Sequence, residues 1–472
     1  MKLVLNGKIN RTYVQSLCMM FFHGEKFPEN EENPTKILNV NTVDTENGIE
    51  CICELEAFNK KVQGKGFARF IEGEKYERTS KSAVGMAVYN AGLELTGKSI
   101  PWGILTGIRP SKVALELISK YGENEADKIL KNRYFLSDNK ANLVVRVAKN
   151  ENEILKLSEN NTCSLYISIP FCPSRCNYCS FISYATPKLF ELIPAYLDKL
   201  VNEIRSTTEK IKKQGLKLLT VYIGGGTPTV LNENQLEFLL KTVYESVDVS
   251  SLLEFTLEGG RPDTITDEKL KIAKKYGVDR ISVNPQTLND KVLEAIGRKH
   301  TVKDFLEAYD RVQNSGIKFV NTDLIAGLEN DTFDSFKSTI DKIISLNPDN
   351  VTVHSFSVKK SAQILQDDNT IYDKSDEYAI KSVDYAYETL VAHGYEPYYM
   401  YRQKNTVCDL ENVGYSKKGA FGIYNVLMMS DSHTVYGVGA GSTTKIVKNI
   451  DGKSEINRIF SKKYPYEYLQ DN

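Results

Sequence analysis

Three cysteines, Cys172, Cys176 and Cys179, lie close together in one segment with the spacing Cys-x3-Cys-x2-Cys. The residues between them are loop formers, so the three thiolates can converge on one metal centre. A 4Fe–4S cluster takes thiolate ligands, and three of them leave one iron open to a further ligand. Zinc is the alternative, but it usually pairs Cys-x2-Cys with a second cysteine or histidine pair, and no such pair is evident. The spacing therefore favours an iron–sulfur cluster with an open iron.

Small and polar residues follow later apolar segments of the same half of the chain. Gly225 and Gly226 have no Cβ, so the backbone there can approach a ligand closely and offer its amides to it. Glu258, Gln286 and Asp323 stand at or just beyond the ends of three further apolar segments. A tight turn or a helix cap is the alternative for each residue taken singly. Together they are typical of a ligand site at the mouth of a barrel.

The elements that must position these residues are strands alternating with amphipathic helices from about residue 164 onward. Long connections between apolar strands predict a parallel sheet covered by helices. The expected strands are 165–169, 218–223, 253–257, 280–283, 319–325 and 351–356. Six such units predict an α/β fold built on a partial (β/α)6 barrel, in which functional groups gather at the carboxyl ends of the strands.

The residues before this barrel have a different pattern. Residues 1–78 look strand-rich, with a hairpin signal at Asn47-Gly48, and helical spacing of apolar residues follows at 82–95, 111–121 and 140–157. We therefore predict three parts: an α+β N-terminal extension of unknown role, the partial barrel, and a mixed C-terminal region that closes the active site. Their expected bounds are 1–158, 159–360 and 361–472.

Composition excludes several classes of protein. The chain has 472 residues, 41% of them hydrophobic, and a net charge of -1. Such a chain is globular and lacks the basic field of a general nucleic-acid binder. Its N-terminus is too soon interrupted by polar residues for a signal peptide, and no stretch approaches a membrane span. We therefore expect a cytoplasmic protein, in which the remaining cysteines, among them Cys163 and Cys408, are free thiols.

The cysteine triplet after a first barrel strand resembles the radical S-adenosylmethionine (radical SAM) superfamily. In that superfamily the open iron binds the amino and carboxylate groups of S-adenosylmethionine. Further segments resemble its oxygen-independent coproporphyrinogen III oxidase group, in particular a coproporphyrinogen dehydrogenase-like subgroup with a long N-terminal extension. The segments that carry this resemblance are 166–172, 224–229, 258–263, 280–287, 296–300 and 323–328.

The resemblance implies a cofactor site made of a 4Fe–4S cluster and S-adenosylmethionine. It implies Cys172, Cys176 and Cys179 as cluster ligands and no particular catalytic side chain. The residues it implies for S-adenosylmethionine are Tyr166, Tyr178, Gly225, Gly226, Thr227, Glu258, Gln286, Arg298 and Asp323. Taken singly, Arg298 also suits a solvated surface, and each tyrosine also suits a core.

For activity, the resemblance implies oxidative decarboxylation of two coproporphyrinogen III propionates to vinyls, which gives protoporphyrinogen IX. It also implies an electron donor such as flavodoxin or ferredoxin. The sequence departs from the family pattern at Ser168, where the family has His, at Phe181, where established oxidases have a fourth Cys, and at 327–331. These departures also occur in haem chaperones, so a haem-binding chaperone stays an alternative. Another is a radical SAM enzyme acting on a different tetrapyrrole.

Two later segments mix aromatic residues with cations, as the site of a carboxylated macrocycle would. They are residues 353–361, with His354, Lys359 and Lys360, and residues 398–405, with Arg402 and Lys404. An aromatic strand with solvated basic ends suits both segments equally well. The chaperone signature His-Asn-x-x-Tyr-Trp is missing, and the single tryptophan is Trp102.

Overall fold

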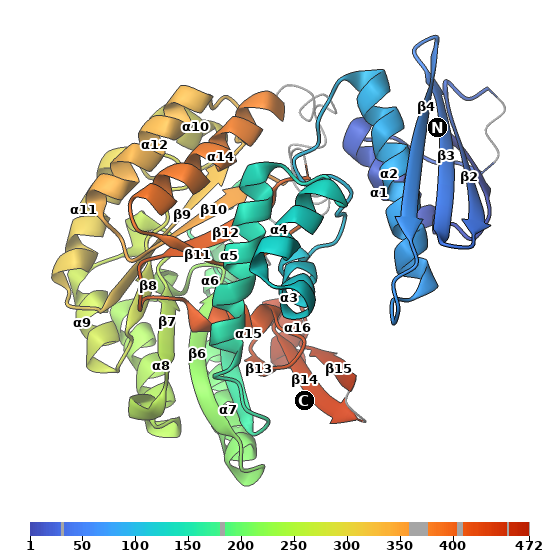
Figure 1. Cartoon of the computed structure of the whole chain (residues 1–472). Coiled ribbons are helices and arrows are strands. Elements are labelled where there is room, and N and C mark those ends of the chain that lie inside the picture. Colours follow the sequence, from blue (N-terminus) through green and yellow to red (C-terminus); the bar gives the residue numbers. More distant parts are fainter. Residues whose placement is uncertain (30–32, 180–184, 358–375, 404–408, 451–452, 472) are drawn as a thin grey trace. The chain divides into compact units, whose positions relative to one another are not determined.

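The computed structural model describes residues 1–29, 33–179, 185–357, 376–403, 409–450 and 453–471 (Figure 1). The chain divides into two compact units. The first consists mainly of Met1–Ala148 and includes a later segment, Tyr401–Glu411, and the second holds most of the remaining chain. The three-part division at 158 and 360 stays a prediction.

The first unit opens with a four-stranded sheet in the order β1-β2-β3-β4. Strand β1 runs parallel to β2, and the other neighbours are antiparallel. Helices α1 and α2 lie beside this sheet (Figure 1). Strand β4 comes so close to α2 that a Cβ on Gly64 or Gly66 would lie 2.0 or 2.1 Å from a carbonyl oxygen of α2. Glycine is therefore needed where β4 meets α2. The bounds are β1 Lys2–Asn6, α1 Arg11–Phe21, β2 Lys36–Thr45, β3 Gly48–Ala57, β4 Lys60–Arg69 and α2 Tyr76–Thr96.

Three further helices follow: α3 Pro110–Tyr121, α4 Glu123–Asn132 and α5 Asp138–Leu155. Helices α2, α3 and α5 confirm the three helices expected from apolar spacing. The sequence analysis did not predict α1 or α4. In α4 the buried residues are Ala126 and Leu130, and so small an apolar stripe is a weak periodic signal.

The second unit is built on an open eleven-stranded sheet in the order β11-β12-β10-β9-β8-β7-β6-β5-β13-β14-β15. Strands β5 to β10 lie in sequence order and pair in parallel, which confirms the six expected strands and the partial (β/α)6 architecture. Their bounds are β5 Thr162–Ile169, β6 Lys217–Gly225, β7 Glu254–Glu258, β8 Arg280–Ser282, β9 Phe319–Ala326 and β10 Asn350–Ser355.

Strands from the C-terminal region extend both ends of this sheet. Strand β12 pairs antiparallel with β10, and β13 pairs parallel with β5. The sheet order then places β11 beyond β12 and the hairpin β14–β15 beyond β13. The bounds are β11 Glu396–Arg402, β12 Glu411–Ser416, β13 Thr434–Val438, β14 Thr443–Ile450 and β15 Lys453–Phe460.

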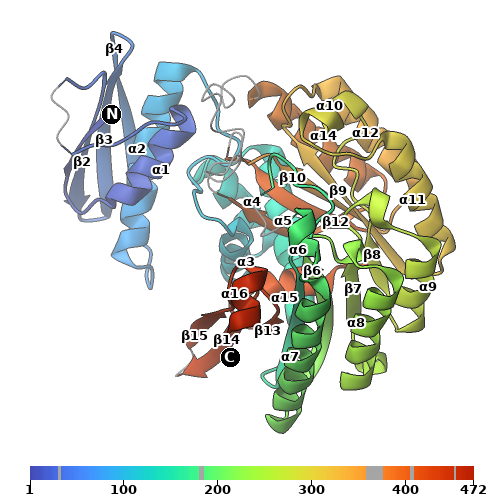
Figure 2. The same cartoon turned by 180° about the vertical axis from the view of Figure 1, so that it is seen from behind.

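Helices connect the parallel strands, and Figure 2 shows α8, α9, α11 and α12 along one face of the sheet. Capping boxes start α8 at Asn232 and α11 at Thr301, so the helix starts are set by local sequence. Among the described residues, no helix is both long and apolar enough to cross a membrane. The helices of this unit are α6 Pro187–Phe190, α7 Ile193–Lys213, α8 Glu233–Ser246, α9 Asp267–Lys275, α10 Asp290–Ala295, α11 Val302–Asn314, α12 Phe333–Leu346, α14 Asp376–Ala392, α15 Ile423–Met429 and α16 Pro465–Gln470.

Candidate cofactor site

The parallel register brings the carboxyl ends of neighbouring strands to one edge of the sheet. Ile169 of β5 lies opposite Gly225 of β6, and Glu258 of β7 lies opposite Ser282 of β8. Asp323 lies on the next strand, β9, and the backbone N–H of Gln286 donates to its carbonyl oxygen at 3.0 Å. The cysteine segment, the glycine segment, Glu258 and Gln286 therefore lie at or just beyond strand ends at the same edge of the sheet, whereas Asp323 lies inside β9 and not at its end as expected.

The cysteine segment begins directly after β5 and is held by backbone contacts. Cys172 and Cys176 are each 9% exposed, and Cys179 is half-buried. The N–H of Asn177 donates to the Ile296 carbonyl at 3.1 Å, and the N–H of Cys179 donates to Cys176 at 3.1 Å. None of the three cysteines forms a disulfide within the described part of the chain. The segment thus presents three sulfur atoms from one loop.

The glycine segment packs directly against this loop. A Cβ on Gly226 would lie 2.9 Å from Cys172 Sγ and 2.6 Å from the Phe171 carbonyl oxygen, and Gly225 has a φ of 113°. The N–H groups of Gly226 and Thr227 donate to Ile169 and Phe171 at 2.7 and 2.8 Å. These amides are therefore engaged within the protein, contrary to the expectation that they face a ligand. The glycines provide close approach to the cysteine loop instead.

Glu258 lies at the centre of a partly buried aromatic cluster. It accepts hydrogen bonds from the Tyr222 hydroxyl and from the Gly225 N–H. Burial raises the pKa of Glu258 to about 7, and the negative charge of Asp323 adds to the rise. The Tyr222 ring stacks on Tyr424 of α15 with centroids 4.3 Å apart. The Glu258 carboxyl group is therefore harder to ionise than an ordinary glutamate, because its pKa is raised.

Tyr166 of β5 joins the same aromatic cluster. Its ring stacks on Tyr222 and on Tyr424, with centroids 6.2 Å apart in both cases. Burial, with the nearby Glu258 carboxylate, raises the pKa of its hydroxyl well above the ordinary value. The sequence pointed to Tyr166 but not to Tyr222 or Tyr424. Tyr424 comes from a helix far along the chain, and no local pattern marks it.

Asp323 is oriented by two asparagines that the sequence analysis did not single out. Its Oδ2 accepts from Asn284 Nδ2 at 2.8 Å, and its Oδ1 accepts from Asn321 Nδ2 at 2.7 Å. Gln286 is buried and has a positive φ of 68°, which fixes the turn after β8. The side chain of His354 on β10 also faces Asp323, with Nε2 at 4.0 Å from Oδ2. The carboxylate is thus held in one orientation.

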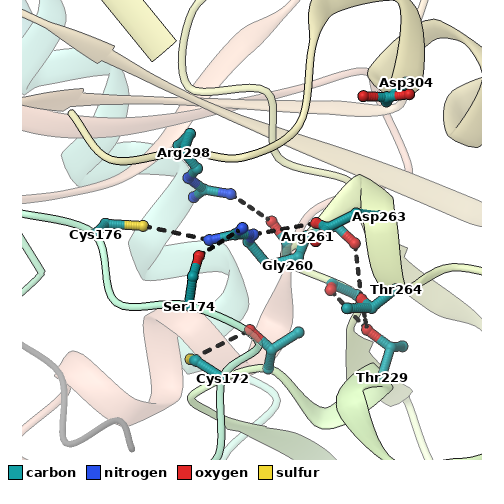
Figure 3. Close-up of polar contacts among 12 residues, drawn as sticks. Cys172, Ser174, Cys176, Thr229, Gly260, Arg261, Asp263, Thr264, Arg298 and Asp304 are labelled. Atoms are coloured by element: carbon teal, nitrogen blue, oxygen red, sulfur yellow. Dashed lines mark hydrogen bonds and ion pairs between the residues drawn. The ribbon is translucent and has the colours of Figure 1, made fainter. Parts of the chain in front are cut away.

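Two arginines lie beside the cysteine loop (Figure 3). Arg298 donates to the Gly260 carbonyl at 3.2 Å and to the Tyr178 hydroxyl at 3.2 Å. Burial raises the pKa of Tyr178 well above its ordinary value, although the Arg298 charge opposes the rise. Arg261, which the sequence analysis did not single out, places Nη1 at 3.5 Å from Cys176 Sγ. Two guanidinium charges therefore stand close to the predicted ligands.

These residues fit an iron–sulfur cluster. The cysteines are largely shielded from water, and the arginines offset the negative charge that thiolates and sulfide would bring. Within the described part of the chain, no three His, Cys, Asp or Glu side chains converge closely enough for a single metal ion. In a four-iron cluster each cysteine binds a different iron, so the three sulfur atoms need not meet at one point.

Several residues from the sequence analysis lie outside the described residues or have other contacts. Phe181, Lys359, Lys360, Lys404 and Cys408 lie outside the described residues. Arg402 is buried, donates to the Asp409 and Leu105 carbonyls, and lies over the Trp102 ring at 5.2 Å. Its guanidinium is thus committed within the first unit, contrary to the suggestion that it faces a carboxylated ligand.

The comparisons with known proteins agree with this geometry. Residues 166–343 match the Radical SAM superfamily. The oxygen-independent coproporphyrinogen-III oxidase-like protein HemZ of Bacillus subtilis is 32% identical, covering 96% of this chain and 92% of that protein. The heme chaperone HemW of B. subtilis is 32% identical, covering 64% of this chain and 77% of that protein.

A solved structure supports the fold. Coproporphyrinogen III oxidase (HemN) from Escherichia coli matches 68% of this chain and 71% of its own, with a TM-score of 0.50 and 21% identity. The superfamily uses a 4Fe–4S cluster and S-adenosylmethionine, which confirms the two predicted cofactors. With the HemZ match along nearly the whole chain, we conclude that this chain belongs to the radical SAM superfamily and, within it, to the oxygen-independent coproporphyrinogen III oxidase-like family.

Proposed function

We propose that the protein is an enzyme that oxidatively decarboxylates the propionates of coproporphyrinogen III to vinyls, without oxygen, in haem biosynthesis. The observation that carries this proposal is the length of the HemZ match, which covers 96% of this chain, N-terminal extension included. The HemW match covers 64% of the chain. An oxidase-like relative thus accounts for residues that the chaperone match leaves out.

In this proposal Cys172, Cys176 and Cys179 hold the cluster. The residues that hold S-adenosylmethionine are Tyr166, Tyr178, Gly225, Gly226, Thr227, Glu258, Gln286, Arg298 and Asp323. Once bound, the two cofactors supply radical chemistry that removes a hydrogen atom from a propionate side chain. The protein's own part is to orient the ligand and to exclude water. The glycines let the cysteine loop pack closely against the end of β6, and the stacked tyrosines shield the site from water.

Two further parts of the proposal concern partners and domains. We propose a donor such as flavodoxin or ferredoxin, because reduction of the cluster requires an electron from outside the chain. We also propose that residues 361–472 close the active site. Strands β11 to β15 of that region extend both ends of the sheet that carries the candidate site, which supports this role.

Replacing Asp323 with Ala should weaken S-adenosylmethionine binding at least about tenfold, a loss of roughly 1.4 kcal/mol. Asn284 and Asn321 fix the carboxylate at the sheet edge, so its loss removes a pre-oriented acceptor. Equilibrium dialysis of the reconstituted protein measures the affinity, and the iron content should not change. Asp349→Asn is the matched control, because Asp349 accepts from Val320 N–H at the opposite edge of the sheet. Unchanged affinity with a lower melting temperature would show a structural role.

The activity is tested by anaerobic reconstitution with iron and sulfide, followed by coproporphyrinogen III, S-adenosylmethionine and a reductant. Protoporphyrinogen IX formed in step with 5′-deoxyadenosine is the expected result. 5′-Deoxyadenosine formed without this product would point to another tetrapyrrole. Tight haem binding with neither product would replace the oxidase with a chaperone, the second candidate, which the HemW match favours.

The position of Phe181 gives a further arm to the same assay. Established oxidases carry a fourth cysteine there, so Phe181→Cys tests whether that cysteine speeds substrate turnover. We expect cluster content and 5′-deoxyadenosine formation to be equal in the two proteins, because the three-cysteine scheme does not use this position. A change in cluster content would contradict that expectation.

A further inference from the structure

Arg261 is a buried cation at the cysteine loop. Its side chain is 4% exposed, and it follows β7 in the short segment before the 3-10 turn Pro262–Thr264. A guanidinium so far from water requires partners of opposite charge or strong hydrogen-bond acceptors. The contacts of Arg261 therefore indicate what its charge acts on.

The guanidinium bridges the cysteine loop and its own segment, as Figure 3 shows. Nη1 lies 3.5 Å from Cys176 Sγ, and Nη2 donates to Ser174 Oγ at 2.9 Å. On the other side Nε donates to Asp263 Oδ1 at 3.2 Å. Asp263 and Ser174 thus fix the plane of the guanidinium and direct one of its N–H groups at a sulfur atom.

Arg298, the other arginine of this region, has a different set of contacts. Its hydrogen bonds go to the Gly260 carbonyl and the Tyr178 hydroxyl, and its charge acts on Cys176 only through space. The two arginines therefore differ in which groups of the site their guanidinium groups contact. Arg298 contacts Tyr178, a residue proposed for S-adenosylmethionine, whereas Arg261 places an N–H donor at the sulfur of a proposed cluster ligand.

We propose that Arg261 is a positioning residue that raises the reduction potential of the cluster through its contact with Cys176 Sγ. Reduction adds negative charge to a cluster, and a nearby cation with an N–H donor at a ligand sulfur stabilises the reduced form more than the oxidised one. Burial strengthens the effect, because little water screens the charge. This inference rests on the proposed cluster site and not on the identity of the substrate.

Asp263 gives the proposal a second, opposite consequence. Its carboxylate partly cancels the Arg261 charge and is about one-third exposed (33%). Asp263→Asn removes that negative charge and keeps an oxygen that accepts from Nε. Arg261→Met removes the cation and its donors. The two substitutions should therefore shift the cluster potential in opposite directions.

The test is a reductive titration of the reconstituted full chain, without S-adenosylmethionine, followed by the EPR signal of the reduced cluster. We expect a lower midpoint potential in Arg261→Met, partial recovery in Arg261→Lys, and a higher midpoint in Asp263→Asn. Lys269→Met is the matched control. Lys269 is a buried cation that donates to the Thr229 and Thr264 carbonyls, so its removal should shift the midpoint far less.

A cluster that assembles in Arg261→Met with the wild-type midpoint would overturn the proposal. If Arg261→Met assembles no cluster, Asp263→Asn decides: a higher midpoint supports the proposal, and an unchanged or lower one overturns it. A wild-type protein that takes up no cluster would refute the proposed site itself. That outcome differs from a cluster that assembles but has the same midpoint potential with and without Arg261, which would refute only the role of Arg261.

Discussion

Replacing Cys176 with Ala should abolish both cluster assembly and cleavage of S-adenosylmethionine. Cys176 is one of three cysteines that the loop after β5 presents, and three cysteine ligands leave one of the four irons open. Loss of one ligand therefore removes the cluster or leaves it without its fixed geometry. Iron and sulfide content, absorbance near ~400 nm from thiolate-to-iron charge transfer, and 5′-deoxyadenosine formation measure the result.

Cys163→Ala is the matched control for this experiment. Cys163 is a buried free thiol on β5, the strand that leads into the cysteine loop, and burial raises the pKa of its thiol to about 12. A thiol with so high a pKa stays protonated near neutral pH and is therefore a poor metal ligand. The control variant should keep its full iron content. Full cleavage activity in Cys176→Ala would refute the ligand assignment.

Glu411→Gln should destabilise the first unit by about 3 kcal/mol, the lower end of the range for breaking a buried ion pair. Glu411 Oε1 lies 2.6 Å from Lys140 Nζ, and the two side chains are 2% and 1% exposed. Its other oxygen accepts from Trp102 Nε1 at 2.7 Å. The neutral variant removes the carboxylate charge that lies 2.6 Å from the buried Lys140 ammonium, which is the main cause of the loss.

Urea unfolding followed by fluorescence measures this loss locally, because Trp102 is the single tryptophan of the chain. Glu125→Gln is the control: Glu125 lies in the same unit and pairs with Lys128 at 3.2 Å, but both side chains are more than half exposed. That pair should contribute less than about 1 kcal/mol. Equal losses in the two variants would contradict the burial argument.

The same pair predicts how stability depends on pH. Burial opposes ionisation of Glu411, but Lys140 and Trp102 outweigh it and hold its pKa below the ordinary value. A carboxyl group with a lowered folded-state pKa stabilises the protein above its unfolded pKa and loses that contribution as the pH falls. Acid should therefore weaken the wild-type protein more than Glu411→Gln.

The fully buried Trp102 also bears on the chaperone alternative. Its side chain is 0% exposed and is committed to Glu411. It therefore provides no aromatic surface for a haem. The haem-binding arm of the activity assay tests the alternative directly.

Some features of the site follow from the sequence alone, because they are local. The cysteine spacing lies within one loop, and its position after an apolar strand follows from the same segment. Glu258, Gln286 and Asp323 are separated in sequence, but a parallel sheet brings the ends of successive strands to one edge whatever its details. The six strands, the helices α2, α3 and α5 and the iron–sulfur cluster were predictable for this reason, whereas S-adenosylmethionine was implied by the resemblance to the radical SAM superfamily.

Other features were decided only by tertiary structure. Three residues contact side chains that are distant in sequence and that no local pattern predicts: Tyr424, Asn284 and Arg261. The backbone N–H groups of Gly226 and Thr227 donate to carbonyl oxygens at and just after the end of β5. The Lys140–Glu411 pair joins residues 271 positions apart. The periodicity and spacing of residue types in the sequence predict which element a residue belongs to and which face of that element it occupies. Which distant side chain meets it depends on how the elements pack, and packing is settled only when the whole chain has folded.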